Sequence, residues 1–190
     1  MFRTALPAAL ALLLAAPAAG LAQAATPAAA PTLPAVKTLT MGGFGFEHTV
    51  TLPGTPTEVF DAVTGDLLPW WDHFFTPGRP ARLYLEPRMG GCFCEEFDTL
   101  GNGARHAVVT FADRGKRLTF EGQLGLSGSG LHMVHTYEFA ARADSTVLTV
   151  KVRGTGEMEP SWPAAVNGVW HHFIVERFKP YYERTRAQRR

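Results

Sequence analysis

The chain has two cysteines, Cys92 and Cys94, and their spacing raises the question of a disulfide or a metal site. In an extended strand, side chains two residues apart point to the same side, with their Cα atoms about 6.6 Å apart. That separation is near the upper limit for a disulfide, so a bridge would require a local distortion of the strand. We expect two small side chains that fill one face of a strand, because free cysteine usually behaves as a small hydrophobe. A disulfide and a thiolate metal site stay open as alternatives.

A metal site at the cysteines would need about four protein ligands, so histidines would have to complete it. The candidates are His132, His135, His171 and His172. No spacing ties them to the cysteines, and His132 and His135 point to opposite faces of a strand because they are three residues apart. The sequence therefore assigns no metal ligands and no cofactor.

Glu95 falls on the opposite face of the same predicted strand, between Phe93 and Phe97. The two phenylalanines indicate that this face is the core side, which would place the carboxyl inside. A carboxyl in such surroundings needs a cationic partner or shifts toward its neutral form. It would then act as an acid or base, or anchor the polar end of a ligand. The alternative that we favour places Glu95 near the strand end, where it reaches water or a structural arginine.

A histidine and a tyrosine share one face of a later predicted strand. Met133, His135, Tyr137 and Phe139 alternate there with more polar residues. In an apolar cavity, His135 and Tyr137 would orient a carbonyl or hydroxyl of a ligand. A satisfied pair in the core is the commoner situation, because buried polar groups normally find partners.

Four large aromatic residues fall within six positions: Trp70, Trp71, Phe74 and Phe75. One short helix cannot bury all of them on a single face. They would form the mouth or lid of a cavity, or they would plug one end of the sheet, since aromatic side chains dominate core burial.

Trp170 and Phe173 lie on the buried stripe of a predicted C-terminal helix. His171 and His172, about 100° apart around the same helix, cannot both face inward. We expect these two histidines at an edge of the helix or in solvent.

The sequence lacks the motifs of several catalytic classes. It has no His-Glu-x-x-His run, no Gly-x-Ser-x-Gly elbow, no phosphate-binding glycine-rich loop and no dinucleotide fingerprint. Lysine and arginine total 18 against 17 aspartate and glutamate, so no charged surface points to nucleic acid. With 46% hydrophobic residues, the chain is typical of a globular domain with a real core.

The N-terminus has the pattern of a secretory signal peptide. Arg3 precedes a continuous apolar run, and small residues follow it up to Ala24. The run is too short for a comfortable membrane span, so we expect cleavage after Ala24, a periplasmic or secreted protein and no stable membrane insertion. An uncleaved anchor is the alternative. The expected organisation is a signal peptide at 1–24, a Pro/Ala-rich linker at 25–38, a folded domain at 39–184 and a basic tail at 185–190.

Hydrophobic periodicity sets the expected elements of the domain. Alternation predicts seven strands, at 44–52, 82–86, 91–98, 106–112, 117–124, 131–140 and 146–152. A capping box of Thr55 and Glu58 opens a short helix, and a second short helix and a loop are expected within 67–75. A long helix begins near Pro163 and should stop or kink at Pro180. The expected fold is α+β: a curved seven-stranded antiparallel sheet wrapped around a long C-terminal helix, with two short helices after the first strand.

Four stretches carry a resemblance to a known superfamily: residues 57–64, 88–95, 109–118 and 170–182. They resemble the SRPBCC (START-like, helix-grip) superfamily, and the chain looks closest to the branch of chaperone-ATPase-activator-like and polyketide-cyclase-like proteins. The resemblance spans about residues 44–183 and implies a helix-grip fold. It does not imply a reaction, because the superfamily holds lipid carriers, cyclase-like enzymes and hormone receptors. Two features differ from this branch. A signal peptide is not expected in a cytosolic co-chaperone, and Pro180 shortens a C-terminal helix that is usually longer in the family.

These observations give one leading functional hypothesis and two alternatives. The leading one is an exported domain that binds a hydrophobic small molecule or lipid between the sheet and the C-terminal helix. Its candidate lining residues are Trp70, Trp71, Phe74, Glu95, His135, Tyr137, Trp170 and Phe173. The alternatives are a cyclase- or hydrolase-like enzyme that uses a buried Glu, His or Tyr, and a metal-handling or protein-interaction module that uses Cys92-x-Cys94. The sequence does not indicate an oligomeric state.

Overall fold

The computed structural model describes residues 38–188, which fall in one compact unit. The expected signal peptide, nearly all of the linker and the last two residues of the basic tail lie outside the described residues. Within the described range, no helix is both long enough and apolar enough to span a bilayer.

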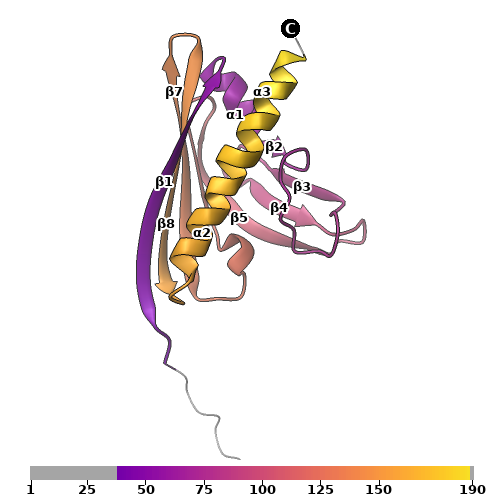
Figure 1. Cartoon of the computed structure of the whole chain (residues 1–190). Helices are drawn as coiled ribbons and strands as arrows, with labels where there is room; N and C mark the ends of the chain where they lie inside the picture. Colours follow the sequence, from indigo (N-terminus) through magenta and orange to yellow (C-terminus); the bar gives the residue numbers. More distant parts are fainter. Residues whose placement is uncertain (1–37, 189–190) are drawn as a thin grey trace, which may run out of the picture. The chain divides into compact units, whose positions relative to one another are not determined.

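The domain is built on a single antiparallel sheet that curves but does not close (Figure 1). The strands lie in the order β1-β8-β7-β6-β5-β4-β3-β2, so each strand from β2 to β7 pairs with the next one in the chain. This confirms the antiparallel meander, and β1 joins it by pairing with β8 along its whole length. The strands are β1 (Met41–Pro53), β2 (Gly65–Asp66), β3 (Arg82–Leu85), β4 (Cys92–Glu96), β5 (Gly103–Asp113), β6 (Arg117–Glu121), β7 (Leu131–Arg142) and β8 (Ser145–Glu157).

The strand count differs from the sequence-based expectation by one. The seven predicted strands are all present, and the additional strand is β2, which has two residues and pairs with the end of β3. Two residues are too few for a period-two pattern to be recognised in a sequence.

The first short helix is the one that the sequence predicts. In α1 (Pro56–Val63), Thr55 and Glu58 form the expected capping box, and Val59, Phe60 and Val63 are buried. The second helix, expected within 67–75, is absent. Leu67 instead accepts hydrogen bonds from the backbone of Trp70 and Trp71 in a single turn, and an irregular loop follows. A short 3-10 helix, η1 (Leu124–Leu126), lies between β6 and β7.

A long helix follows the sheet in three segments: α2 (Trp162–His171), η2 (His172–Phe178) and α3 (Lys179–Ala187). They form one continuous helix that lies along the sheet (Figure 1). The expected stop at Pro180 is wrong, because the helix continues to Ala187. The segment η2 is π-helical, and the Lys179 N–H donates to the Ile174 carbonyl five residues back. This wider turn directly precedes Pro180, and the chain continues through the proline into α3.

The core lies between the concave face of the sheet and this helix. Alternate residues of β7 are buried from Leu131 to Phe139, as the sequence predicts. Trp170, Phe173 and Phe178 of the helix belong to the same buried cluster. The helix therefore covers the apolar face that a curved open sheet cannot bury against itself.

Candidate functional site

A pocket of about 320 Å³ opens beside the C-terminal helix. Its walls are mainly apolar and come from four parts of the fold. The loop after β2 contributes Trp71, Phe74 and Phe75, the helix contributes Val166, Val169, Trp170 and Phe173, the strands contribute Phe93 and Met133, and η1 contributes Leu124 and Leu126. The polar side chains that line the pocket are His73, His106 and Gln123.

Trp71 holds the loop wall of the pocket in place. Its ring stacks on Phe173 with the ring centroids 3.5 Å apart and meets the rings of Phe93 and Trp170 edge-on. Its Nε1 donates a hydrogen bond of 2.7 Å to the His73 carbonyl, which fixes the following residues of the loop. A buried tryptophan with a satisfied N–H forms a rigid wall.

Glu95 lies just behind the pocket wall and is fully buried. Its carboxylate accepts backbone hydrogen bonds from Phe75 at 2.9 Å and from Thr76 at 3.1 Å. The Nε2 of His106 lies 3.0 Å from Glu95 Oε2. Glu95 does lie near the strand end, as the penultimate residue of β4, but the expectation that it reaches water or an arginine is wrong, because its carboxyl is buried and its side-chain partner is His106.

His106 reaches this position because of a β-bulge that the sequence did not reveal. Phe93 pairs with Ala107 and Cys94 with Arg105, so His106 is an extra residue in β5. Both His106 and Ala107 are consequently buried, although strict alternation would send them to opposite faces. Gly122, the residue after β6, packs closely against the bulge because it has no side chain. A Cβ at this position would collide with the His106 carbonyl oxygen.

Cys92 and Cys94 form a disulfide directly across from this bulge. The expectation of two reduced cysteines is therefore wrong, and the distortion required for a bridge is present. The Cα atoms are 5.4 Å apart, shorter than the roughly 6.6 Å of a regular strand. With both sulfur atoms in the bridge, no thiolate remains at this position to bind a metal.

The remaining sequence candidates occupy different surroundings. Trp71, Phe74, Trp170 and Phe173 line the pocket. Trp70 is buried beside it, with its ring centroid 5.1 Å from that of Phe178.

His135 and Tyr137 lie deeper, in the core between the sheet and the helix. The His135 ring stacks on Phe120 at 4.9 Å, and its two nitrogens have no hydrogen-bond partner among residues 38–188. Burial lowers the pKa of His135 to about 3, and the nearby Phe120 backbone only partly opposes this shift. Burial also raises the pKa of the Tyr137 hydroxyl. Both groups are neutral near pH 7.

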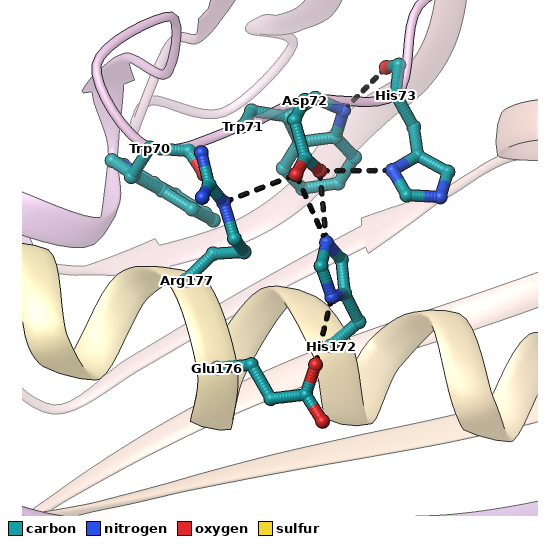
Figure 2. Close-up of polar contacts among 7 residues, drawn as sticks. All are labelled: Trp70, Trp71, Asp72, His73, His172, Glu176 and Arg177. Atoms are coloured by element: carbon teal, nitrogen blue, oxygen red, sulfur yellow. Dashed lines mark hydrogen bonds and ion pairs between the residues drawn. The ribbon is translucent and has the colours of Figure 1, made fainter.

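A polar cluster lies next to the pocket, with Asp72 at its centre (Figure 2). His73 Nδ1 lies 2.9 Å from the Asp72 carboxylate, and His172 Nε2 lies 3.0 Å from it. Arg177 Nε is 3.1 Å from the second carboxylate oxygen. The Nδ1 of His172 lies 2.9 Å from Glu176.

Electrostatics within this cluster favour charged groups. Burial opposes ionisation of Asp72, but hydrogen bonds from His73 and His172 outweigh it and hold the pKa of that carboxyl below its ordinary value. The hydrogen bond to Glu176, followed by that to Asp72, raises the pKa of His172. The expected edge position of His172 agrees with its partial exposure. The partners of His172 could not be predicted from spacing, because Asp72 and His172 are 100 residues apart.

Comparison with known proteins identifies the fold and no family. No protein-family model and no curated protein matches the sequence. A solved protein of unknown function from Staphylococcus aureus has a TM-score of 0.57 at 13% identity, covering 78% of this chain and 98% of that chain. An uncharacterised protein from Rhizobium leguminosarum has a TM-score of 0.56 at 17% identity, with 78% and 99% covered. A protein from Chromobacterium violaceum has a TM-score of 0.52 at 18% identity, with 73% and 96% covered. At these identities the likeness establishes an α+β helix-grip arrangement.

Proposed function

We propose that this protein binds a compact hydrophobic molecule with one polar end in the pocket beside the C-terminal helix. The observation that carries the proposal is the combination of mainly apolar walls with the buried Glu95–His106 pair at one side. Small-molecule sites are mostly apolar, with a few convergent polar groups that fix orientation. The volume of about 320 Å³ favours a ring system or a short acyl chain over a complete diacyl lipid, since ligand pockets span about 300–1,000 Å³.

We also propose that the chain is an SRPBCC-like protein and that it is exported. The helix-grip arrangement supports the first statement. The N-terminal sequence pattern and the Cys92–Cys94 disulfide support the second, because disulfides persist mainly in oxidising compartments. The mass of the protein isolated from its own cells tests export. Loss of residues 1–24 agrees with it, and a cytoplasmic protein with its N-terminus intact would contradict it.

Ligand binding is tested by filling the pocket. Val166 lines it and Ala164, on the same helix, does not. In Val166→Trp, we expect at least about tenfold weaker binding of an environment-sensitive dye, because the indole occupies the space that the dye needs. Ala164→Trp adds the same side chain on the exposed part of the helix and should bind the dye as the wild type does. Equal dye affinity in all three proteins would contradict the proposal.

A second function, proton transfer to or from the bound molecule, is favoured by one observation. The His106 side chain lines the pocket while Glu95 holds its Nε2, an arrangement in which a carboxylate orients an imidazole. The test uses molecules that displace the dye and follows each by mass spectrometry. Conversion by the wild type, lost in His106→Gln with dye binding retained, agrees with an enzyme. Recovery of every displacing molecule unchanged would leave a binding protein.

A further inference from the structure

Three potential metal-ligand atoms converge beside the pocket, in the cluster drawn in Figure 2. They are a carboxylate oxygen of Asp72, Nδ1 of His73 and Nε2 of His172, and all lie within 4.8 Å of one another. The two nitrogen atoms are 2.9 Å and 3.0 Å from the Asp72 carboxylate. A metal with bonds of about 2.0–2.1 Å to each donor needs only small side-chain movements to fit between them.

Glu176 orients one of these donors. It lies 2.9 Å from Nδ1 of His172, so the opposite nitrogen, Nε2, points at Asp72. Histidines that bind metals almost always donate their other N–H to a carboxylate or carbonyl, which fixes the ring and its tautomer. The Glu176–His172 pair supplies this feature, and it is independent of the proximity of the three donors.

The donors also stand on parts of the fold that packing holds in place. His172 belongs to the continuous C-terminal helix. The loop that carries Asp72 and His73 is held by the Trp71 indole, which donates to the His73 carbonyl and stacks on Phe173. The His73 ring itself meets Phe173 edge-on, with centroids 5.0 Å apart. Preorganised donors bind a metal without ordering a loop.

We propose that Asp72, His73 and His172 bind a divalent first-row transition metal, with Zn²⁺ as the probe. Two imidazoles and one carboxylate suit Zn²⁺ and neighbouring metals better than Mg²⁺ or Ca²⁺, which prefer all-oxygen sites. Three protein ligands leave a further coordination position, as in catalytic zinc sites. His73 also lines the pocket, so the metal would stand next to the bound molecule.

Arg177 limits the strength of this site. Its Nε lies 3.1 Å from one Asp72 oxygen, which leaves the other oxygen for the metal. The adjacent positive charge opposes a second cation. The cluster without a metal is a network of ion pairs that joins the loop to the helix, and this is the arrangement that the proposal must be tested against.

The test is a Zn²⁺ titration of the tag-free full-length protein against a chromogenic chelator at pH 7.5. We expect one Zn²⁺ per chain, and binding at least about tenfold weaker in His73→Ala and in His172→Ala, since each loses a ligand. Glu176→Gln should weaken binding by about 10–100-fold through loss of orientation. A hundredfold excess of Zn²⁺ over Kd should raise the wild-type Tm by about 5–10 °C.

His132→Ala is the matched control, because His132 is exposed and pairs with Glu121 away from this cluster. Its Zn²⁺ affinity should equal that of the wild type. His73 is more than half exposed, so His73→Ala keeps the test valid if His172→Ala folds poorly. No binding by the wild type would overturn the proposal and leave the ion-pair network. Equal binding by the wild type and His73→Ala would also overturn it, because the metal would then lie elsewhere.

The metal proposal does not depend on the proposed ligand of the pocket. Val166→Trp should lose dye binding and keep its Zn²⁺ affinity, since Val166 is not one of the metal donors. Glu176→Gln, at a residue that does not line the pocket, should weaken Zn²⁺ binding by about 10–100-fold and keep dye binding. The two proposals can therefore fail separately.

Discussion

Nε2 of His106 lies 3.0 Å from Oε2 of Glu95, and the strand irregularity that brings them together faces the Cys92–Cys94 disulfide across two paired strands. The bulge in β5 turns a histidine inward, and the bridge in β4 shortens the opposite strand. Two local departures from regular sheet geometry thus place a carboxyl–imidazole pair beside an apolar pocket, and β-bulges commonly redirect side chains in this way.

Glu95 should be important for stability because it satisfies several buried donors. Glu95→Ala leaves the amides of Phe75 and Thr76 and the His106 ring without their acceptor. We expect a loss of about 3 kcal/mol in the free energy of unfolding, measured by urea denaturation. Glu96→Ala is the control, since its partners Arg82 and Tyr84 lie on the more exposed face and the change should cost about 1 kcal/mol or less. Equal losses in the two variants would contradict the buried role of Glu95.

His135 should make the domain less stable in acid. Its pKa in the folded state is about 3, against 6.5 for an exposed histidine, so between these values only the unfolded chain takes up the proton. Stability from this residue is fully present above pH 6.5 and falls as the pH decreases toward 3, by about 1.4 kcal/mol per unit. His135→Phe should remove this slope while preserving the stacking on Phe120.

The interval between pH 6.5 and 5 is the best place to measure the effect of His135. Glu58, whose pKa is lowered from 4.5 to about 2 by the Thr55 backbone and then by Arg186, loses its stabilising effect only as the pH falls below 4.5. Urea denaturation of wild type and His135→Phe across the higher interval separates the two groups. Parallel stability curves would show that His135 is protonated in the folded protein or reached by water.

The disulfide should contribute modestly, because it closes a very short loop. The loop-entropy relation gives about 1–2 kcal/mol for a bridge between residues two apart. We expect reductant to lower the Tm of the wild type by a few degrees and to leave Cys92→Ala/Cys94→Ala unchanged. Thiol titration of the denatured, unreduced protein should find no free thiols. Two reactive thiols would contradict the bridge, and the position of His106 would then rest on the bulge alone.

Sequence reasoning succeeded where a structural feature follows from local periodicity. The capping box at Thr55, the inward face of β7 and the buried stripe through Trp170 and Phe173 all depend on residues a few positions apart. It failed at His106, because one inserted residue reverses the alternation, and at Pro180, where a π-helical segment precedes the proline and the helix continues.

The sequence also could not reveal contacts between distant segments. His172 meets Asp72 across 100 residues, and no spacing rule links a loop residue to the helix that later packs on it. The aromatic segment around Trp71 predicts a second short helix and a loop, yet the Trp71 ring packs against Phe93 and Phe173 at once, which an irregular loop permits and one helical face does not. Tertiary packing decided both cases.

Native mass spectrometry of the protein isolated from its own cells tests the central claim most directly. A ligand held in the pocket should give the wild type a native mass above its denatured mass, and the difference should be absent in Val166→Trp and present in Ala164→Trp. A difference equal to one zinc ion that persists in Val166→Trp and is lost in His73→Ala would belong to the Asp72 cluster. If the wild type carries no organic mass as isolated and gains none when incubated with short fatty acids and aromatic compounds, the pocket is not a binding site and the account is contradicted.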